Sequence, residues 1–119
     1  MRLRLVGIAS LFFLCGAYGA SAFSGAELLQ ACAEKADTAG DLTCNAYLRG
    51  FIQGMTVGIA LKEQAKMAYC PPQKEAIQIA QGRLIAEKYF RSNPEKLHID
   101  ASLLLGLAFV EAFPCRTSN

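Results

Sequence analysis

The chain has 119 residues, enough for one small domain; 53% of them are hydrophobic and 18% are charged. This composition is too apolar for a disordered chain. The formal net charge is only +2, which disfavours nucleic acid as a partner, because proteins that bind it usually carry a concentrated basic face. The single histidine, His98, excludes a multi-histidine metal site.

The first 22 residues have the pattern of a secretory signal peptide. A basic start at residues 1–4 is followed by an apolar run at 5–17 and a small-x-small cleavage pattern at 20–22. The apolar run is shorter than the roughly 20 residues that a membrane span needs. We expect export through the inner membrane, cleavage after Ala22, and a periplasmic domain of residues 23–119 without a membrane anchor. Lipidation of Cys15 is a weaker alternative, because Leu14 precedes it where a small residue is usual.

The mature domain is predicted to be all-α. Ala, Leu, Glu, Lys and Gln dominate it, and strict alternation of apolar and polar residues is missing. The first helix is expected over residues 25–36. It begins with a predicted capping box, in which Ser24 caps the amide of Glu27 and the Glu27 carboxylate reaches back to Ser24.

The second helix is predicted over residues 42–67, with Asp41 or Thr43 as its N-cap. One apolar stripe repeats along it at helical spacing: Leu48, Ile52, Met55 and Ile59. Three glycines lie four residues apart on a neighbouring face: Gly50, Gly54 and Gly58. Because each glycine costs a helix about 1 kcal/mol relative to alanine, we expect another backbone to pack closely against them inside the bundle.

A third helix is predicted over residues 73–91, because Pro71 and Pro72 end the second one and Pro72 suits the first turn of the next. Its apolar strip consists of Ile77, Ala80 and Leu84. Its charged side chains are expected to be solvated: Lys74, Arg83, Glu87 and Lys88.

The chain between the third and fourth helices is a turn at residues 92–94, followed by one short helical turn at 94–97. The fourth helix is predicted over residues 100–113 with Asp100 as its cap. Glu111 is the only charge in residues 101–113, so this helix is expected to be central and buried on nearly every face.

Four cysteines remain in the mature domain, and an even number in an exported protein predicts two disulfides. Cys44 and Cys70 cannot pair if residues 42–67 are one helix. Such a helix is about 39 Å long, whereas a disulfide needs Cα atoms within about 7 Å. In an antiparallel bundle the first helix ends where the second begins, and the second and fourth end together. This arrangement predicts the pairs Cys32–Cys44 and Cys70–Cys115 in a small antiparallel bundle of four, or four to five, helices.

No pattern in the sequence predicts a catalytic site. The mature domain lacks a Cys-x-x-Cys pair, a glycine-rich phosphate loop and an identifiable carboxylate pair. A cysteine hydrolase with His98 as its base is a weak hypothesis, because exported cysteines in even number are usually bonded. We therefore expect no catalytic residue, no cofactor and no metal, and a function in binding.

Three blocks of the sequence resemble the Rap/Tai family of immunity proteins. Residues 44–54 fit the family pattern C-x-x-Y-x-x-G-x-x-x-G. Residues 69–71 read Tyr-Cys-Pro and precede a helix ending in Lys-Tyr-Phe, and residues 93–98 resemble the stretch P-E-x-L-H. The third block is an apolar helix from Ala101 that closes on Ala-Phe-Pro-Cys at 112–115. The similarity covers about residues 26–115.

The resemblance implies a small α-helical periplasmic protein, often a homodimer. Such proteins bind a peptidoglycan amidase of a type VI secretion system, a papain-like cysteine hydrolase, and block its cleft with a protruding segment. The matched residues are mostly structural, so the contact residues must come from this chain's own loops. The polar connection at residues 91–99 is the first candidate, and its proposed contact residues are Arg91, Asn93, Glu95, Lys96 and His98. The connection at 66–74 is the second.

One alternative is a periplasmic helical protein without a toxin partner, such as an acid-stress chaperone like the HdeA-like bundles. Such chaperones release apolar surface when carboxylates become protonated, and the chain has ten acidic residues that could respond.

Overall fold

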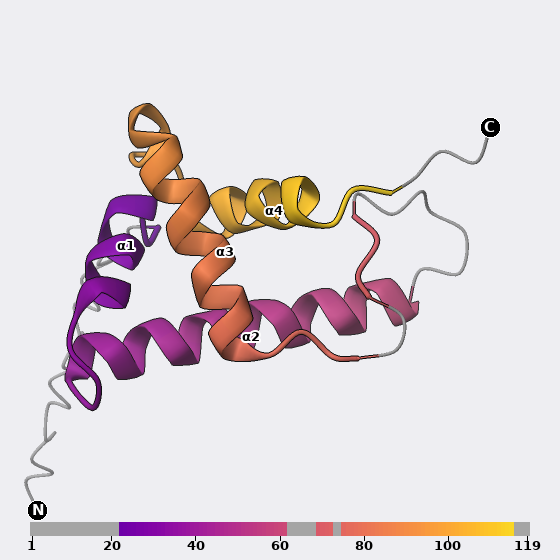
Figure 1. Ribbon diagram of the computed structural model, residues 1–119, viewed down its shortest axis with the longest axis horizontal. Helices are drawn as coiled ribbons and strands as arrows, with labels where there is room; N and C mark the ends of the chain where they lie inside the picture. The colour runs from indigo at the N-terminus through magenta and orange to yellow at the C-terminus, as the bar shows by residue number, and fades with distance from the viewer. Residues whose placement is uncertain (1–21, 62–68, 73–74, 116–119) are drawn as a thin grey trace, which may run out of the picture.

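The described part of the chain folds into four α-helices and one 3-10 turn (Figure 1). The computed structural model describes residues 22–61, 69–72 and 75–115. The elements are α1 (Gly25–Ala33), α2 (Ala39–Leu61), α3 (Ile79–Ser92), η1 (Pro94–Lys96) and α4 (Ala101–Ala112). No strand occurs within these residues, so the predicted all-α class is confirmed. None of the helices in the described ranges is both long and apolar enough to span a bilayer.

Two of the predicted helix caps are present, at the starts of α1 and α4. The Ser24 amide donates to Glu27 Oε2 at 2.8 Å, and the Glu27 amide donates to Ser24 Oγ at 3.3 Å. The Ser102 amide donates to Asp100 Oδ1 at 2.8 Å. These side chains satisfy amides that the first helical turn leaves unpaired.

The turn between α1 and α2 differs from its prediction. α1 ends at Ala33 rather than at residue 36, and Asp37 takes a positive φ of 63° in the turn that follows. α2 begins at Ala39, so neither Asp41 nor Thr43 is its N-cap. Instead Thr38 Oγ1 accepts from the Asp41 amide at 3.3 Å. The predicted part of this helix at 62–67 lies outside the described residues.

α3 begins at Ile79, six residues later than predicted, so Pro72 is not in its first turn. The reason is a set of contacts between this segment and the distant end of α4. The Cys70 amide donates to the Phe113 carbonyl at 2.9 Å, and Cys70 is bonded to Cys115. These contacts hold the chain at residues 69–72 against the end of α4, and Gln78 is still in extended conformation at the N-cap of α3.

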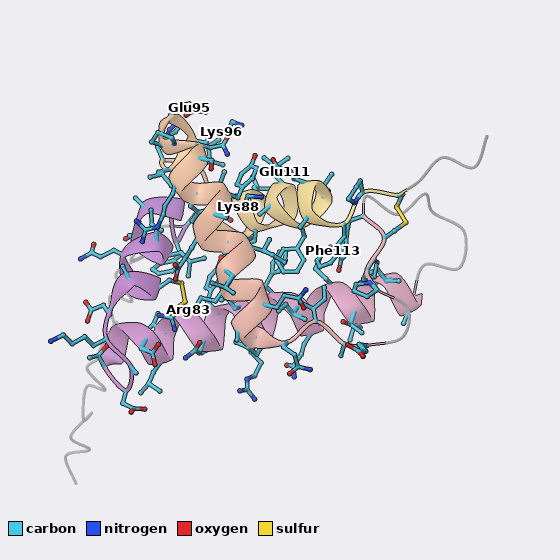
Figure 2. All side chains as sticks on the ribbon, in the orientation of Figure 1. Arg83, Lys88, Glu95, Lys96, Glu111 and Phe113 are labelled. Carbon is cyan, nitrogen blue, oxygen red and sulfur yellow. A yellow bond between two sulfur atoms is a disulfide. The ribbon has the colours of Figure 1, made fainter. Side chains whose placement is uncertain are left out.

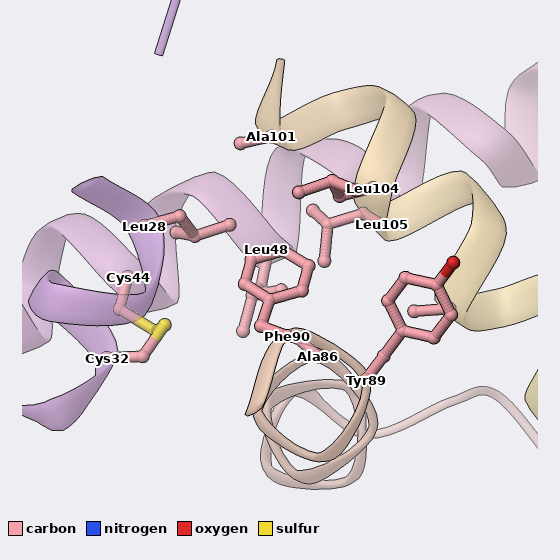
Figure 3. Close-up of a cluster of buried hydrophobic side chains, with 11 residues drawn as sticks. Leu28, Cys32, Cys44, Leu48, Ala86, Tyr89, Phe90, Ala101, Leu104 and Leu105 are labelled. Carbon is pink, nitrogen blue, oxygen red and sulfur yellow. A yellow bond between two sulfur atoms is a disulfide. The ribbon is translucent and has the colours of Figure 1, made fainter. Parts of the chain in front are cut away.

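The core lies where α1, the first half of α2, the second half of α3 and α4 meet (Figure 3). Its largest fully buried side chains are Phe90, Phe109, Leu28, Leu48, Leu104, Leu105 and Cys44. Burial of these apolar side chains is the main source of stability in a domain of this size.

Two sequence-based expectations about helix faces are wrong. α4 is not buried all round, because Leu103 and Leu107 are 63% and 47% exposed. The glycines of α2 are not a close-packing seam either. A Cβ added at Gly50, Gly54 or Gly58 would meet no heavy atom within 4 Å. Four short helices are too few to surround one another, so apolar faces remain uncovered where no neighbour reaches.

Both predicted disulfides are present. Cys32 and Cys44 are buried and have a Cα–Cα distance of 5.0 Å. Cys70 and Cys115 are exposed and have a Cα–Cα distance of 4.9 Å. α2 and α4 run in the same direction and α3 crosses both (Figure 1), so the chain segments that follow α2 and α4 meet at one end of the molecule.

The apolar strip and the solvated charges predicted for α3 are also partly wrong. Leu84 is 69% exposed. Arg83 is partly buried, and its guanidinium donates to the Asp41 carboxylate, to the Cys32 carbonyl oxygen, and to Glu87 Oε1 at 3.3 Å. Its bonds to Asp41 and Cys32 tie α3 to the hairpin of α1 and α2. Lys88 is exposed as predicted, and Lys74 lies outside the described residues.

The same contacts lower the pKa of the Asp41 carboxyl. The largest cause is the hydrogen bond from Arg83, followed by the bond from the Asp37 amide. The pKa of Arg83 is raised for the reciprocal reason, since its bond to Asp41 favours the charged guanidinium.

Candidate functional site

The connection between α3 and α4 forms a tip that projects past the level of α4 (Figure 2). We define the tip as residues 91–99. α3 ends at Ser92, where the Asn93 amide donates to the Phe90 carbonyl at 3.3 Å. Pro94 then opens η1, because its fixed φ suits the first turn of a helix. Glu95 and Lys96 lie at the end of this projection (Figure 2).

Two of the predicted contact residues hold the tip together from within. Asn93 Nδ2 donates to the Tyr89 carbonyl at 2.8 Å, and Lys96 Nζ donates to Asn93 Oδ1 at 2.8 Å. The Lys96 ammonium also lies 5.5 Å from the centroid of the Tyr89 ring, at cation–π distance. Tyr89 is buried, so it anchors the tip to the core.

The base of the tip is fixed by the start of the domain. The amides of Gly25 and Ala26 donate to the carbonyls of Ile99 and Leu97, both at 2.9 Å. Position 25 favours glycine, because an added Cβ would lie 2.3 Å from Leu104 Cδ1 and 3.3 Å from the Leu97 carbonyl oxygen, so Leu104 would have to shift.

The first predicted mature residue joins the same base. The Ala101 amide donates to the Phe23 carbonyl at 2.7 Å. The Phe23 ring packs on Tyr47, with 5.3 Å between the centroids. Burial of Tyr47 raises the pKa of its hydroxyl, and the charge of Asp100 raises it further. The chain from residue 23 onward is therefore part of the support for the tip.

The two carboxylates that cap helices beside this base have lowered pKa values. Hydrogen bonds from Ser24 lower the pKa of Glu27, the backbone bond being the largest cause. Hydrogen bonds from Ser102 lower the pKa of Asp100, the side-chain bond being the largest cause. Both residues therefore favour the ionised form in which they accept from helix amides.

The other three predicted contact residues are exposed and free to meet a partner: Arg91, Glu95 and His98. The structure thus divides the predicted set by role. Asn93 and Lys96 shape the tip, and the exposed three offer a cation, a carboxylate and an imidazole at its surface. Sequence alone could not separate the two roles, because the division depends on where the Tyr89 carbonyl and ring lie.

The second predicted connection, residues 66–74, is described only at residues 69–72. Its described part borders a groove of about 320 Å³ between this segment and the second half of α2. The groove is mainly apolar, and its lining side chains are Ile52, Thr56, Ile59, Tyr69, Pro71, Pro72, Glu75, Ala76 and Ile77. One carboxylate among apolar side chains does not form an acid–base pair or a nucleophile with its base.

Two of the catalytic kinds considered above, a metal centre and a thiol nucleophile, can be checked in the described residues. Within residues 22–61, 69–72 and 75–115 there is no group of three His, Cys, Asp or Glu side chains that could hold a metal ion. All four cysteines of these ranges are in disulfides, so none of them is a thiol nucleophile for a hydrolase. The structure does offer a projection that is held by hydrogen bonds within it and at its base.

The sequence matches the model of one protein family, described as Rap1a immunity proteins, over residues 24–115. This range runs from the capping residue of α1 to the last cysteine and includes the whole tip. No curated protein and no solved structure matches the chain.

Proposed function

Because the chain belongs to the Rap1a immunity protein family, we propose that it binds and inhibits a peptidoglycan amidase effector of a type VI secretion system. An immunity protein of this family acts against a secreted effector, and such proteins are generally not enzymes. The amidase as the target is supported by the sequence blocks at 44–54 and 93–98, which resemble immunity proteins against amidases.

The observation that carries the mechanism is the internally bonded tip. In the proposed complex the tip enters the substrate cleft of the amidase and excludes the peptidoglycan. Lys96, Asn93 and Tyr89 fix the tip before binding. Little conformational entropy is then lost on association, which favours affinity. The exposed side chains of Arg91, Glu95 and His98 are the proposed contacts with the effector.

The proposed site of action is the periplasm, where the amidase meets its substrate. A leader at residues 1–22 would direct export, and two disulfides suit an oxidising compartment. We further propose that the mature protein is a homodimer, that it needs no cofactor, and that it contacts neither nucleic acid nor the membrane after the leader is removed.

The proposal is tested with purified protein lacking residues 1–22 and the type VI amidase effector of the source bacterium, assayed on peptidoglycan. The unaltered protein should inhibit. Glu95→Lys and His98→Ala should each raise the inhibition constant about tenfold, equivalent to about 1.4 kcal/mol of binding free energy. Lys35→Glu, an exposed charge reversal in the turn between α1 and α2, is the control.

Inhibition that is unchanged in both tip variants would remove the tip from the interface. Absence of inhibition by the unaltered protein would contradict the amidase as target. Lys96→Glu is less informative than Glu95→Lys, because it also breaks the bond to Asn93 that shapes the tip.

The chaperone alternative has one observation in its favour. The Asp41–Arg83 ion pair joins α2 to α3, and protonation of Asp41 in acid would break it. Protection of other proteins from aggregation at low pH, without binding to an amidase, would favour that function instead.

A further inference from the structure

The tip is too small to be the whole contact of a tight inhibitor. Stable protein interfaces use about 20–30 residues and about 800 Å² on each partner. The tip, residues 91–99, has fewer than half of these residues. If it enters a cleft, as proposed above, the walls of the cleft must also cover surface beside the tip.

Two helix faces adjoin the tip, one on α3 and one on α4. The outward face of α3 presents one exposed leucine, Leu84, beside the exposed Lys88 and the half-buried Glu87. α4 presents three exposed apolar side chains, and Glu111 is its only charged residue. Interface cores are depleted of charge and rich in apolar contact, so the face of α4 is the better continuation of the contact.

We define the α4 ridge as Leu103, Leu107 and Val110. These side chains are 63%, 47% and 37% exposed. They follow one another at i, i+4 and i+7, so they lie on one side of the helix. Gly106 lies between them, and a Cβ added there would meet no heavy atom within 4 Å. A partner's side chain could therefore pack onto the helix backbone at the middle of the ridge.

The ridge begins at the base of the tip. α4 starts at Ala101, directly after the tip, and the tip rises past the level of α4 in Figure 1. From Leu103 to Val110 the ridge extends along the helix for about 10 Å. Tip and ridge are thus close in the chain, and the polar projection is followed along α4 by the exposed apolar side chains.

We propose that the α4 ridge is the apolar core of the contact with the effector. The occupant is the amidase of the proposed function, whose cleft receives the tip and whose apolar cleft rim packs on Leu103, Leu107 and Val110. The ridge alone is too small for a stable contact with any partner, because about 10 Å of one helix supplies far less than the roughly 800 Å² per partner that a stable interface buries. The tip supplies more of the contact with the effector, and this is why the effector is the proposed occupant.

The experiment compares two leucine substitutions in the protein lacking residues 1–22. The double variant Leu103→Ala, Leu107→Ala should weaken binding to the purified amidase about 100-fold by calorimetry, since each leucine buried at an interface contributes roughly tenfold. Leu84→Ala is the control, because Leu84 is 69% exposed, close to the 63% of Leu103, but lies on α3. It should leave affinity unchanged. Both variants should keep the helical circular dichroism and the melting temperature, because the replaced side chains are exposed.

Three outcomes would overturn the inference. Affinity of the double variant equal to that of the unaltered protein removes the ridge from the contact. An equal loss in Leu84→Ala makes the effect nonspecific. A change in the mass of the free double variant, measured by light scattering, assigns the ridge to a second copy. The two proposals fail differently. If Glu95→Lys weakens binding and the ridge variant does not, only the proposal about the ridge is wrong. If the unaltered protein does not inhibit the amidase, both proposals are wrong.

Discussion

The two halves of α2 share one apolar stripe but have different surroundings. In the first half, at residues 39–48, Asp41, Cys44 and Leu48 are buried. In the second half, at 49–60, no residue is buried, and the apolar side chains of Phe51, Ile52, Met55 and Ile59 are only half-buried. The apolar stripe continues through both halves at one spacing. The comparison shows that periodicity marks the side of a helix that can be buried, whereas neighbouring elements decide how deeply it is buried.

The neighbours explain the difference. α1, the second half of α3 and the start of α4 all pack on the first half of α2, and the buried disulfide Cys32–Cys44 joins it to α1. The second half meets fewer partners. Phe51 contacts the Phe109 ring with 5.5 Å between centroids, and Ile52 approaches Gly82. At that end the exposed disulfide Cys70–Cys115 supplies a covalent link where packing is sparse.

The largest predicted effect is a loss of stability from a substitution in the first half of α2. Leu48→Ala should lower the free energy of unfolding by about 3 kcal/mol or more, because a fully buried leucine loses its transfer energy and leaves a cavity. Val57→Ala, which truncates an exposed residue of the second half, should cost less than about 0.5 kcal/mol. Urea denaturation of both variants measures the difference. Similar losses would show that the two halves contribute equally.

The second largest effect is a difference between the two disulfides in how readily they are reduced. Mild thiol should reduce Cys70–Cys115 well before Cys32–Cys44, because a thiolate can reach exposed sulfurs without unfolding of the core. Its loss should cost about 2 kcal/mol, the low end of the usual range, since the residues it joins are exposed. Timed alkylation followed by peptide mapping gives the order of reduction. Simultaneous release of all four thiols would mean that both ends open as one unit.

A smaller effect on stability is expected from alanine substitutions at two glycines. Gly54→Ala should stabilise the protein by about 1 kcal/mol, because alanine favours the helix and open space surrounds the new methyl group. Gly25→Ala should destabilise it by about 1 kcal/mol or more, since the methyl group would overlap Leu104. Thermal melts of both variants provide the test. Loss of stability in Gly54→Ala would indicate that a second copy covers this face.

The smallest predicted effect is on pH dependence. The pKa of Asp41 lies below its ordinary value of 3.8, so its ion pair with Arg83 contributes stability above that pH and loses it as the pH falls further. Glu27 and Asp100 also have lowered pKa values and add to the same acid loss. Asp41→Asn should be less stable than the unaltered protein at pH 7 and should lose less stability in acid. Parallel denaturation curves at pH 7 and pH 3 provide the check.

Short-range chemistry in the sequence was enough to predict several features. These are the all-α class, the capping box at Ser24, the cap at Asp100, the helical turn after Asn93 and the two cysteine pairs. The caps and the turn depend on residues a few positions apart. The cysteine pairs followed from the length of one helix together with the antiparallel arrangement expected of short connections. The position of the projecting connection also followed from its polar residues and from Pro94.

Tertiary structure decided what depends on neighbours distant in the chain. The start of α3 moved to Ile79 because the chain at Cys70 is held against the end of α4. Arg83 became an internal ion-pair partner because Asp41 and the Cys32 carbonyl lie beside it. The sequence alone also did not predict that the α4 ridge is exposed, or that Asn93 and Lys96 bond within the tip. Helical spacing places side chains on a face, but only the packing of the other helices determines whether that face meets protein or solvent.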